Sequence, residues 1–505
     1  MPYLYRIDAR LENSSALIWA CENGRLDTAR YALEHGAAVN ARSPRHRRSQ
    51  ALKVAVENHH VELVELLLAK GADVNGRDLS HGSTALFEAA HCGSARMLDA
   101  LLSRKDILVN LRTEHGFSSL HAVCSNENTT NLKKLLQRPD IDVNCPGLNG
   151  RTALHSACGD DTTTRVELLL GHENIEVDVL DDQNWSPLHV ACDCGRADIA
   201  KILLARNDVA IDRPMMVERI EVMGTVLEYT TPFLVAAKSY NTELFDVVFS
   251  KKSMINTTAV TGRGMNAIML ASRRRDSKTL QKLLGVVDID INARSANGKT
   301  AFAYAVEAAI DRLRHRDDEE DKDVLPASIR DPDGILSLLL QHGADPSIPD
   351  NRGNTVLHHT VREGHVAMTR RLLEDSRVDP GHPSRFGWTP LHIAARDCPE
   401  GMLELFLNIK DIDLNCLNNQ GLTPLSEATE AADLRAMRLL LDDPRIIVDH
   451  KGDGGETPEE IASRSGRLST TRLLRDYRKK MEPVKPPAQK SPRRKRAQRR
   501  PGLKL

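Results

Sequence analysis

Apolar side chains recur along this chain with a helical period that is interrupted at regular intervals. Val61, Val64, Leu67 and Leu68 have the three- and four-residue spacing of one helix face, and Gly71 follows where such a helix would end. A shorter segment with apolar residues on one face precedes each segment of this kind, and a polar stretch follows it. The pattern therefore predicts pairs of helices joined by extended loops.

These helix pairs repeat in register. A Thr, a Ser or an equivalent residue marks the start of each unit, at Ser15, Gln50, Thr84, Ser118, Thr152, Ser186, Thr231, Asn266, Thr300, Thr355, Thr389, Thr423 and Thr457. Of the twelve intervals between markers, eight are 34 residues, two are 35, and two are 45 and 55. Ala stands five residues after the marker in eleven of the thirteen units, which chance does not explain. We therefore predict an all-α solenoid of about thirteen units over residues 14–477.

The residue types fit their places in one unit. The hydroxyl of a marker such as Thr389 can cap a helix, and Pro390 is tolerated at the first helical position, where the N–H has no partner. Leu391 and Ala394 share one face, and the small Ala allows a neighbouring helix to approach closely. Gly near nine residues past the marker, as in Gly195, is expected to end the short helix.

At this point the residues resemble the ankyrin repeat. Thr-Pro-Leu-His-Ile-Ala at 389–394, Ser-Pro-Leu-His-Val-Ala at 186–191, and the segment 67–75 carry the resemblance. It implies a right-handed stack of helix pairs, β-hairpin-like fingers on one side, and a concave face that acts as a binding module. The implied function is a non-enzymatic scaffold or adaptor for a protein partner. The Asn residues that end the Asp-Val-Asn-like loops resemble positions that can be hydroxylated, although we expect a structural role for them: Asn75, Asn110, Asn144, Asn292 and Asn415.

The N-terminal edge carries a second resemblance. Residues 1–13 are predicted to cap the first helix pair, and residues 2–8 with 15–20 look like the junction in filamentous-fungal proteins that join an F-box to an ankyrin array. That resemblance implies the alternative function, a substrate-recognition subunit of a ubiquitin ligase. No F-box precedes Pro2, so either the module was lost or the start of this chain is incomplete.

Several exposed positions are candidates for partner binding. The first finger contains Arg45, Arg47 and Arg48, which could contact an acidic partner or form an ordinary solvated loop. Trp185 and Trp388 each stand one residue before a marker, and each is either an interface anchor or a ring packed on its neighbouring finger.

The two long intervals contain insertions, near residues 213–229 and 308–334. Residues 215–229 alternate apolar and polar about Met223-Gly224, which predicts an enlarged β-hairpin finger with Arg219 and Glu221 as partner-binding residues. In the second insertion the first helix is expected to continue past Ile310. Six of the seven residues from 317 to 323 are acidic, and we predict that this block is disordered.

The C-terminal tail has a charge of its own. Residues 478–505 carry twelve Lys and Arg against the single acid Glu482, a formal charge of +11, so the rest of the chain carries −12 of the total of −1. We predict a disordered basic tail with a bipartite nuclear-import signal recognised by an importin. The signal comprises Arg478, Lys479, Lys480, Arg493, Arg494, Lys495 and Arg496, with a proline-directed phosphorylation site at Ser491. The alternatives are non-specific, salt-dependent contact with nucleic acid and a merely soluble terminus.

Other classes of protein and site are disfavoured. No apolar run of about 18 residues exists and the N-terminus lacks an apolar leader, so we expect an intracellular monomer of the cytoplasm, the nucleus or both, without a membrane contact. The sequence contains no phosphate-binding Gly loop, no His-Glu-x-x-His and no nucleophile elbow. We therefore predict no catalytic residues and no cofactor.

Cysteine and histidine could suggest a metal or redox site. However, Cys21, Cys124, Cys158 and Cys192 fall six residues past their markers, which predicts small core residues. Histidines recur three residues past the marker, at His121, His155, His189, His358 and His392. Equivalent positions in stacked repeats lie about 8 to 10 Å apart, whereas a zinc ion needs ligands at about 2 Å. We therefore predict no metal site and expect these rings to hydrogen-bond to the backbone of neighbouring loops.

Overall fold

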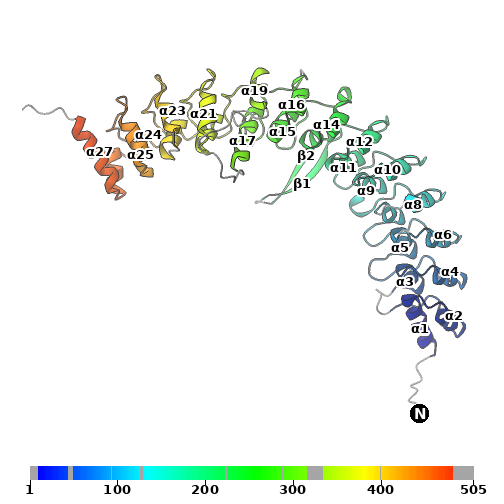
Figure 1. Cartoon of the computed structure of the whole chain (residues 1–505). Coiled ribbons are helices and arrows are strands. Elements are labelled where there is room, and N and C mark those ends of the chain that lie inside the picture. Colours follow the sequence, from blue (N-terminus) through cyan, green and yellow to red (C-terminus); the bar gives the residue numbers. More distant parts are fainter. Residues whose placement is uncertain are drawn as a thin grey trace, which may run out of the picture. The chain divides into compact units, whose positions relative to one another are not determined.

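The computed structural model describes residues 9–43, 49–92, 94–125, 129–221, 224–286, 288–314, 334–397 and 400–481. In these residues the regular structure is helical apart from one two-stranded sheet. The chain divides into two compact units, Met1–Ala309 with Asp331–Ala344, and Ile310–Arg330 with Asp345–Leu505. Figure 1 shows that the helix pairs of each unit follow one another in sequence order.

The first unit stacks first helices on first helices and second helices on second helices. Its first helices are α1 (Ala9–Asn23), α3 (Ala51–Glu57), α5 (Ala85–Cys92), α7 (Ser119–Cys124), α9 (Ala153–Cys158), α11 (Pro187–Asp193), α13 (Pro232–Lys238), α15 (Ala267–Arg274) and α17 (Ala301–Arg314). Its second helices are α2 (Leu26–Glu34), α4 (Val61–Ala69), α6 (Ala95–Leu102), α8 (Thr129–Leu136), α10 (Thr163–Leu170), α12 (Ala197–Leu204), α14 (Thr242–Phe249), α16 (Ser277–Leu284) and α19 (Ile335–Gln341). Successive second helices pack on each other, and so do successive first helices up to α15. Two 3₁₀ turns, η1 (Leu148–Gly150) and η2 (Lys252–Met254), lie in the connections.

The second unit has the same order. Its first helices are α20 (Val356–Arg362), α22 (Pro390–Arg396), α24 (Pro424–Ala431) and α26 (Pro458–Arg464). Its second helices are α21 (Val366–Leu373), α23 (Met402–Leu407), α25 (Leu434–Leu441) and α27 (Leu468–Met481). Each row packs neighbour on neighbour, as in the first unit. The predicted all-α solenoid of helical repeats is thus confirmed in each unit.

The core lies between the two rows of helices. Leu391 and Ala394, the residues predicted to share the buried face of one first helix, are fully buried. Cys21, Cys124 and Cys192 are fully buried too, and burial raises the pKa of each thiol to about 12. Because these thiols stay protonated at neutral pH, they act as small apolar core residues, as the sequence predicts.

Helix starts and stops follow the predicted chemistry. The Thr389 hydroxyl accepts a hydrogen bond from the backbone N–H of His392, and Pro390 occupies the first turn. The weak marker Asn266 also caps its helix, because its side chain accepts from the N–H of Met269. Gly195 ends a first helix at a positive φ of 73°, a conformation that a side chain would strain.

The first insertion is a β-hairpin, as predicted. Strand β1 (Met215–Glu221) pairs antiparallel with β2 (Gly224–Thr230), from Met215 opposite Thr230 to Glu221 opposite Gly224. In the second insertion α17 continues past Ile310 to Arg314, again as predicted. The acidic residues 317–323 lie outside the described residues.

Asparagine side chains join successive repeats. The amide of Asn110 donates to the Asp140 carbonyl at 2.6 Å and accepts from the Asp142 N–H at 2.9 Å, so both ends of the side chain bond to the next loop. Asn75, Asn144 and Asn415 make the same two bonds one repeat onward, and Asn292 donates to the Gly343 carbonyl. These contacts confirm the predicted structural role of the loop asparagines.

Replacing Asn110 by alanine is expected to destabilise the first unit by about 1 kcal/mol, because two hydrogen bonds between repeats are lost at a partly solvated site. Urea unfolding followed by circular dichroism measures the loss. Asn174→Ala removes an exposed amide that makes no such pair of bonds and serves as the matched control. Equal effects of the two substitutions would argue against a stabilising role for the asparagine bonds between repeats.

The two ends of the repeat array differ from the prediction. Helix α1 begins at Ala9, so residues 9–13 extend the first helix and Ser15 lies inside it rather than at its cap. Helix α27 continues to Met481, so residues 478–481 are helical and not part of a disordered tail. In both places the residues continue a helix that already packs on its neighbour, which local composition does not reveal.

Candidate interaction surface

The segments that precede the first helices end in tight turns, which we call fingertips. The turns at residues 350–353, 384–387 and 418–421 each close with a hydrogen bond from a Gly N–H to the carbonyl three residues earlier. Neighbouring fingertips are also bonded to each other. The Arg385 N–H donates to the Arg352 carbonyl at 2.8 Å, and the Asn419 N–H donates to the Phe386 carbonyl at 3.0 Å. The fingertips of a unit are therefore fixed relative to one another by backbone bonds.

Buried histidines hold the base of five fingers. The Thr355 N–H donates to His358 Nδ1 at 3.1 Å, and His358 Nε2 lies 3.0 Å from the Trp388 carbonyl in the next repeat. His121, His155, His189 and His392 make equivalent pairs of bonds. Because Nδ1 accepts and Nε2 faces a carbonyl, the neutral ring with its proton on Nε2 satisfies both bonds. The predicted bonding of these rings to neighbouring loops is confirmed.

Burial sets the charge of these rings. It lowers the pKa of His189 and of His358 to about 4, even though the carbonyl that faces each Nε2 favours the protonated form. The pKa of His121, of His155 and of His392 is lowered by burial as well. The finger bases are therefore uncharged at neutral pH.

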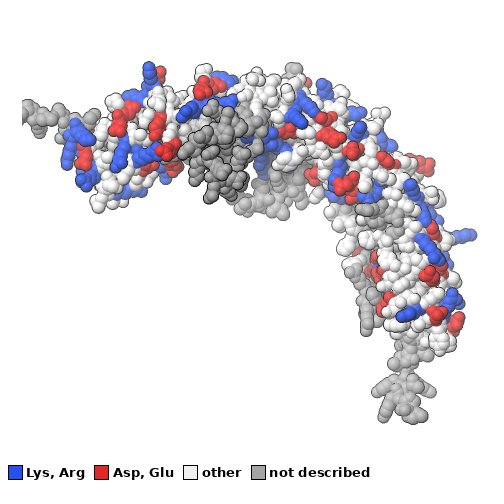
Figure 2. Space-filling model, in the orientation of Figure 1, with Lys and Arg blue, Asp and Glu red and all other residues white. Residues whose placement is uncertain are grey.

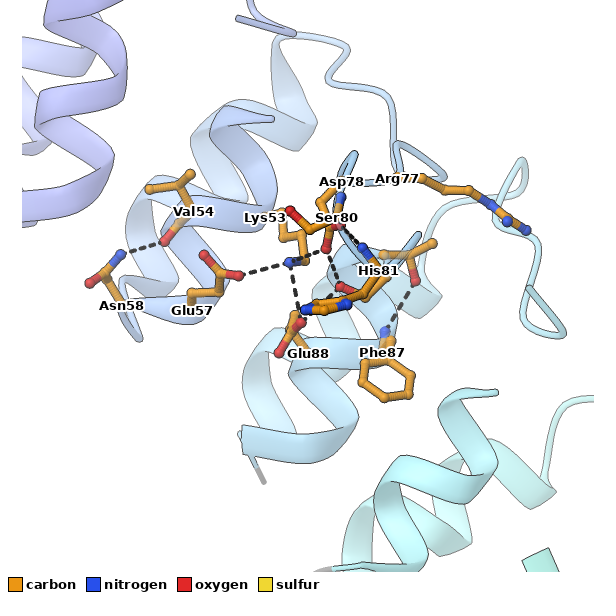
Figure 3. Close-up of polar contacts among 12 residues, drawn as sticks. Lys53, Val54, Glu57, Asn58, Arg77, Asp78, Ser80, His81, Phe87 and Glu88 are labelled. Carbon is orange, nitrogen blue, oxygen red and sulfur yellow. Dashed lines mark hydrogen bonds and ion pairs between the residues drawn. The ribbon is translucent and has the colours of Figure 1, made fainter. Parts of the chain in front are cut away.

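In the second repeat a lysine replaces the histidine. Lys53, on α3, is 1 % exposed, and its Nζ lies 2.7 Å from Glu57 Oε1, 2.8 Å from Asp78 Oδ2 and 3.2 Å from Glu88 Oε1. Figure 3 shows the ammonium group pointing between these three carboxylates. Asp78 in turn accepts from the N–H groups of Ser80 and His81 at 2.8 and 2.7 Å. One ammonium group thus links two first helices to a fingertip.

The network stabilises the charged forms of its members. Burial alone would lower the pKa of Lys53, but hydrogen bonds to Asp78 and Glu57 and the charge of Glu88 outweigh it and raise this pKa. Burial alone would raise the pKa of Asp78, but hydrogen bonds from His81, Lys53, Ser83 and Ser80 lower it well below its usual range. The Lys53–Asp78 pair therefore remains ionised in the folded protein.

Known families agree with this geometry. A family model described as ankyrin repeats (3 copies) matches residues 2–78, 50–113, 120–213 and 327–412, together more than half of the chain. The chain belongs to the ankyrin-repeat family. Ankyrin repeats indicate a protein–protein interaction module.

Similarity to individual proteins is low. The crystal structure of the ankyrin repeat domain of Bcl-3, described as a unique member of the IkappaB protein family, is 22% identical. The match covers 46% of this chain and 97% of that chain, with a TM-score of 0.38. No curated protein matches the sequence.

The two tryptophans differ in the ankyrin array. Trp185 is 9 % exposed, and Arg151 lies over its ring at 5.6 Å from the centroid. Its environment is that of a packed ring, so it offers little surface to a partner. Trp388 is half-buried, with Arg396 at 5.5 Å from its centroid. Of the two, Trp388 keeps the surface that an interface anchor needs.

The structure describes only part of the other predicted positions. Arg45, Arg47 and Arg48 lie outside the described residues, as do residues 2–8, which carry the resemblance to F-box proteins. Arg219 and Glu221 lie on β1, paired with Val226 and Gly224. Their place on the hairpin is therefore known, and partner binding by them stays a prediction.

The predicted import signal is divided between a helix and the undescribed tail. Arg478 lies on α27 and forms ion pairs with Asp449 and, at 3.2 Å, with Glu459. Lys479 and Lys480 are exposed on the same helix. Arg493, Arg494, Lys495, Arg496 and Ser491 lie outside the described residues. The upstream half of the signal is thus helical and partly engaged in ion pairs.

The exposed apolar side chains at the fingertips were not predicted from the sequence. Leu79 is 58 % exposed, Leu148 46 % and Phe386 64 %, and each lies in or beside a hydrogen-bonded turn. The available signal was an apolar residue in a turn that is polar in other units; at the position of Phe386, for example, other units have Arg352, His115 and Asn149. On the face shown in Figure 2, side chains of both charge signs are mixed along both units. Apolar fingertips are therefore the more distinctive feature.

The described part of the chain was searched for a metal-binding cluster and for a membrane-spanning helix. It contains no group of three or more His, Cys, Asp or Glu arranged to hold a metal ion. Among the described residues, no helix combines the length and the apolarity needed to cross a lipid bilayer.

Proposed function

We propose that the chain is a non-enzymatic scaffold or adaptor that binds a protein partner through its fingertips and the adjoining faces of its first helices. The observation that carries the proposal is the exposure of Leu79, Leu148 and Phe386 on fingertips whose backbones are already bonded to their neighbours. Apolar side chains held in a fixed frame lose little conformational entropy when a partner covers them. They have no role in the core, so the repeats do not need them for folding.

Affinity capture from cells, quantified by mass spectrometry, tests the proposal with the intact chain and a variant carrying Leu79→Ser, Leu148→Ser and Phe386→Ser. We expect at least one directly binding protein to fall about tenfold or more in the variant. A control carrying Leu108→Ser and Leu468→Ser removes apolar side chains that are 57 % and 84 % exposed away from the fingertip turns. Partners retained by the fingertip variant but lost by the control would overturn the proposal.

A chain that lacks Met215 to Tyr229 tests the enlarged hairpin separately. Because the hairpin lies between α12 and α13, its removal takes no residue from either helix. We propose that it adds contacts at the edge of the partner, and the deletion is expected to weaken capture without abolishing it. An unchanged partner list would exclude the hairpin from the interface.

A further inference from the structure

Arginines without acidic partners lie at neighbouring fingertips of the second unit. Arg352 and Arg385 are exposed at neighbouring fingertips, and Arg362 is exposed in the last turn of α20. In the described residues of this unit, none of these three guanidinium groups makes an ion pair. Arg396, the equivalent of Arg362 on the adjacent helix α22, is instead bound to Glu427 at 3.1 Å. The charges of Arg352 and Arg385 at the fingertips are therefore not neutralised by ion pairs among the described residues.

An aromatic side chain stands among these charges. Phe386 is 64 % exposed and follows Arg385 directly in the fingertip turn. The backbone here is bonded on both sides, since the Arg385 N–H donates to the Arg352 carbonyl and the Asn419 amide donates to the Arg385 carbonyl at 3.0 Å. We call Arg352, Arg385 and Phe386 the Arg-Phe patch. Its side chains project from a frame that needs no rearrangement before binding.

Close packing keeps the fingertips in this arrangement. Gly353 and Gly387 have positive φ values of 75° and 73°. A Cβ at Gly353 would lie 2.6 Å from the Arg385 nitrogen, and one at Gly387 would lie 2.6 Å from the Asn419 nitrogen. Only glycine allows adjacent fingertips to approach this closely. The spacing between the two arginines is thus set by the backbone.

We propose that the Arg-Phe patch binds an acidic, extended peptide segment of a partner protein that carries an apolar side chain among its Asp and Glu residues. Guanidinium groups bind carboxylates through paired hydrogen bonds. Arginine is enriched among the few residues that dominate the binding energy of protein interfaces. Aromatic residues, phenylalanine included, are enriched at interface cores. This inference rests on the proposed scaffold function and names the chemistry of one partner.

Charge favours a peptide over a nucleic acid. The formal charge of −12 on residues 1–477 opposes any anion, and it opposes a nucleic acid, with a phosphate at every nucleotide, more strongly than a peptide with a few carboxylates. A peptide with a few carboxylates needs only the local positive charge of the patch. The acidic residues 317–323 of this chain have the same chemistry and are the competing occupant that the experiment must separate.

A display selection of random twelve-residue peptides against the intact chain tests the inference. We expect enriched peptides to contain several Asp or Glu residues around one aliphatic or aromatic residue. Their affinity, measured by fluorescence anisotropy, is expected to fall about thirtyfold in a variant with Arg352→Ser and Arg385→Ser, and about tenfold with Phe386→Ser. A control with Arg370→Ser and Arg438→Ser removes the same charge from exposed positions on α21 and α25, and affinity should change less than twofold.

Three results would overturn the inference. The first is a selection that yields no acidic peptides, or acidic peptides that bind the Arg352→Ser, Arg385→Ser variant as tightly as the intact chain. The second is an equally strong, patch-dependent affinity for a twelve-nucleotide oligo-dT. The third is a tenfold gain in peptide affinity when the six acids of residues 317–323 are changed to serine, which would assign the patch to the chain's own segment. In each case the scaffold function is judged independently by the fingertip capture experiment.

Discussion

Replacing Lys53 by methionine is expected to destabilise the second and third repeats by about 3 to 5 kcal/mol, because the substitution leaves buried carboxylates without their counter-charge. The Asp78 side chain is fully buried, and those of Glu57 and Glu88 are 28 % and 19 % exposed. Methionine fills much of the volume of lysine, so packing changes little. The effect therefore reports the loss of the ammonium group rather than a cavity.

Amide hydrogen exchange gives the prediction a local measurement. Exchange in α3, α5 and the fingertip 78–83 is expected to accelerate by about a hundredfold or more, while α22 and α24 in the other unit keep their protection. The double variant Lys53→Met, Asp78→Asn also removes the carboxylate charge that the single substitution leaves unpaired, so it should recover part of the loss.

A matched surface pair provides the contrast. Arg96 and Glu65 form an ion pair at 3.0 Å with side chains 63 % and 43 % exposed, so Arg96→Met is expected to cost less than about 1 kcal/mol. If Lys53→Met were as mild as Arg96→Met, the buried network would have no stabilising role and the position would be tolerant of any long side chain.

Residues that act within one repeat could be predicted from the sequence. Thr389, Pro390 and His392 lie within one helical turn. The same three positions recur in thirteen repeats, so the residue types found there indicate what each position does. The hairpin itself was predictable for the same reason, since alternation is a local signal. Its predicted centre at Met223-Gly224 was one residue too late, because Gly224 pairs with Glu221 and belongs to β2.

Contacts between repeats that occur only once in the array were harder to predict. Lys53 meets Asp78 only because a finger and a first helix from different repeats converge, and no spacing in one repeat encodes that meeting. Trp185 and Trp388 hold the same repeat position, yet one is buried and the other half-buried, because exposure depends on the side chains of neighbouring fingers. The Arg-Phe patch was missed for this reason as well.

Acidification from pH 7 to pH 5 is expected to destabilise both units, with the buried histidines as the cause. The folded-state pKa of His189 and of His358 is about 4, below the ordinary value near 6.5 that the unfolded chain retains. Between these values the unfolded state binds more protons, so stability falls as pH falls. Each of the two rings is expected to contribute about 1 kcal/mol of lost stability per pH unit near pH 5.

Carboxylates do not account for this window. Burial alone would raise the pKa of Asp350, but hydrogen bonds from His359 and from backbone N–H groups lower it to about 2, so its stabilisation is lost only as pH falls below about 4. Burial raises the pKa of Glu427, and that group works in the opposite direction, gaining stability as pH falls. A net loss between pH 7 and pH 5 therefore identifies the histidines.

His358→Gln separates the charge effect from the bonding effect. Glutamine cannot reach both the Thr355 N–H and the Trp388 carbonyl, so the variant is expected to be less stable than the intact protein at pH 7. It cannot be protonated, however, so its stability in the second unit should fall less steeply on going to pH 5. Urea unfolding followed by hydrogen exchange of α20 and α22 at both pH values measures the two slopes. If the stability of both proteins fell equally between pH 7 and pH 5, the His358 ring would not be the titrating group, because glutamine at this position cannot take up a proton.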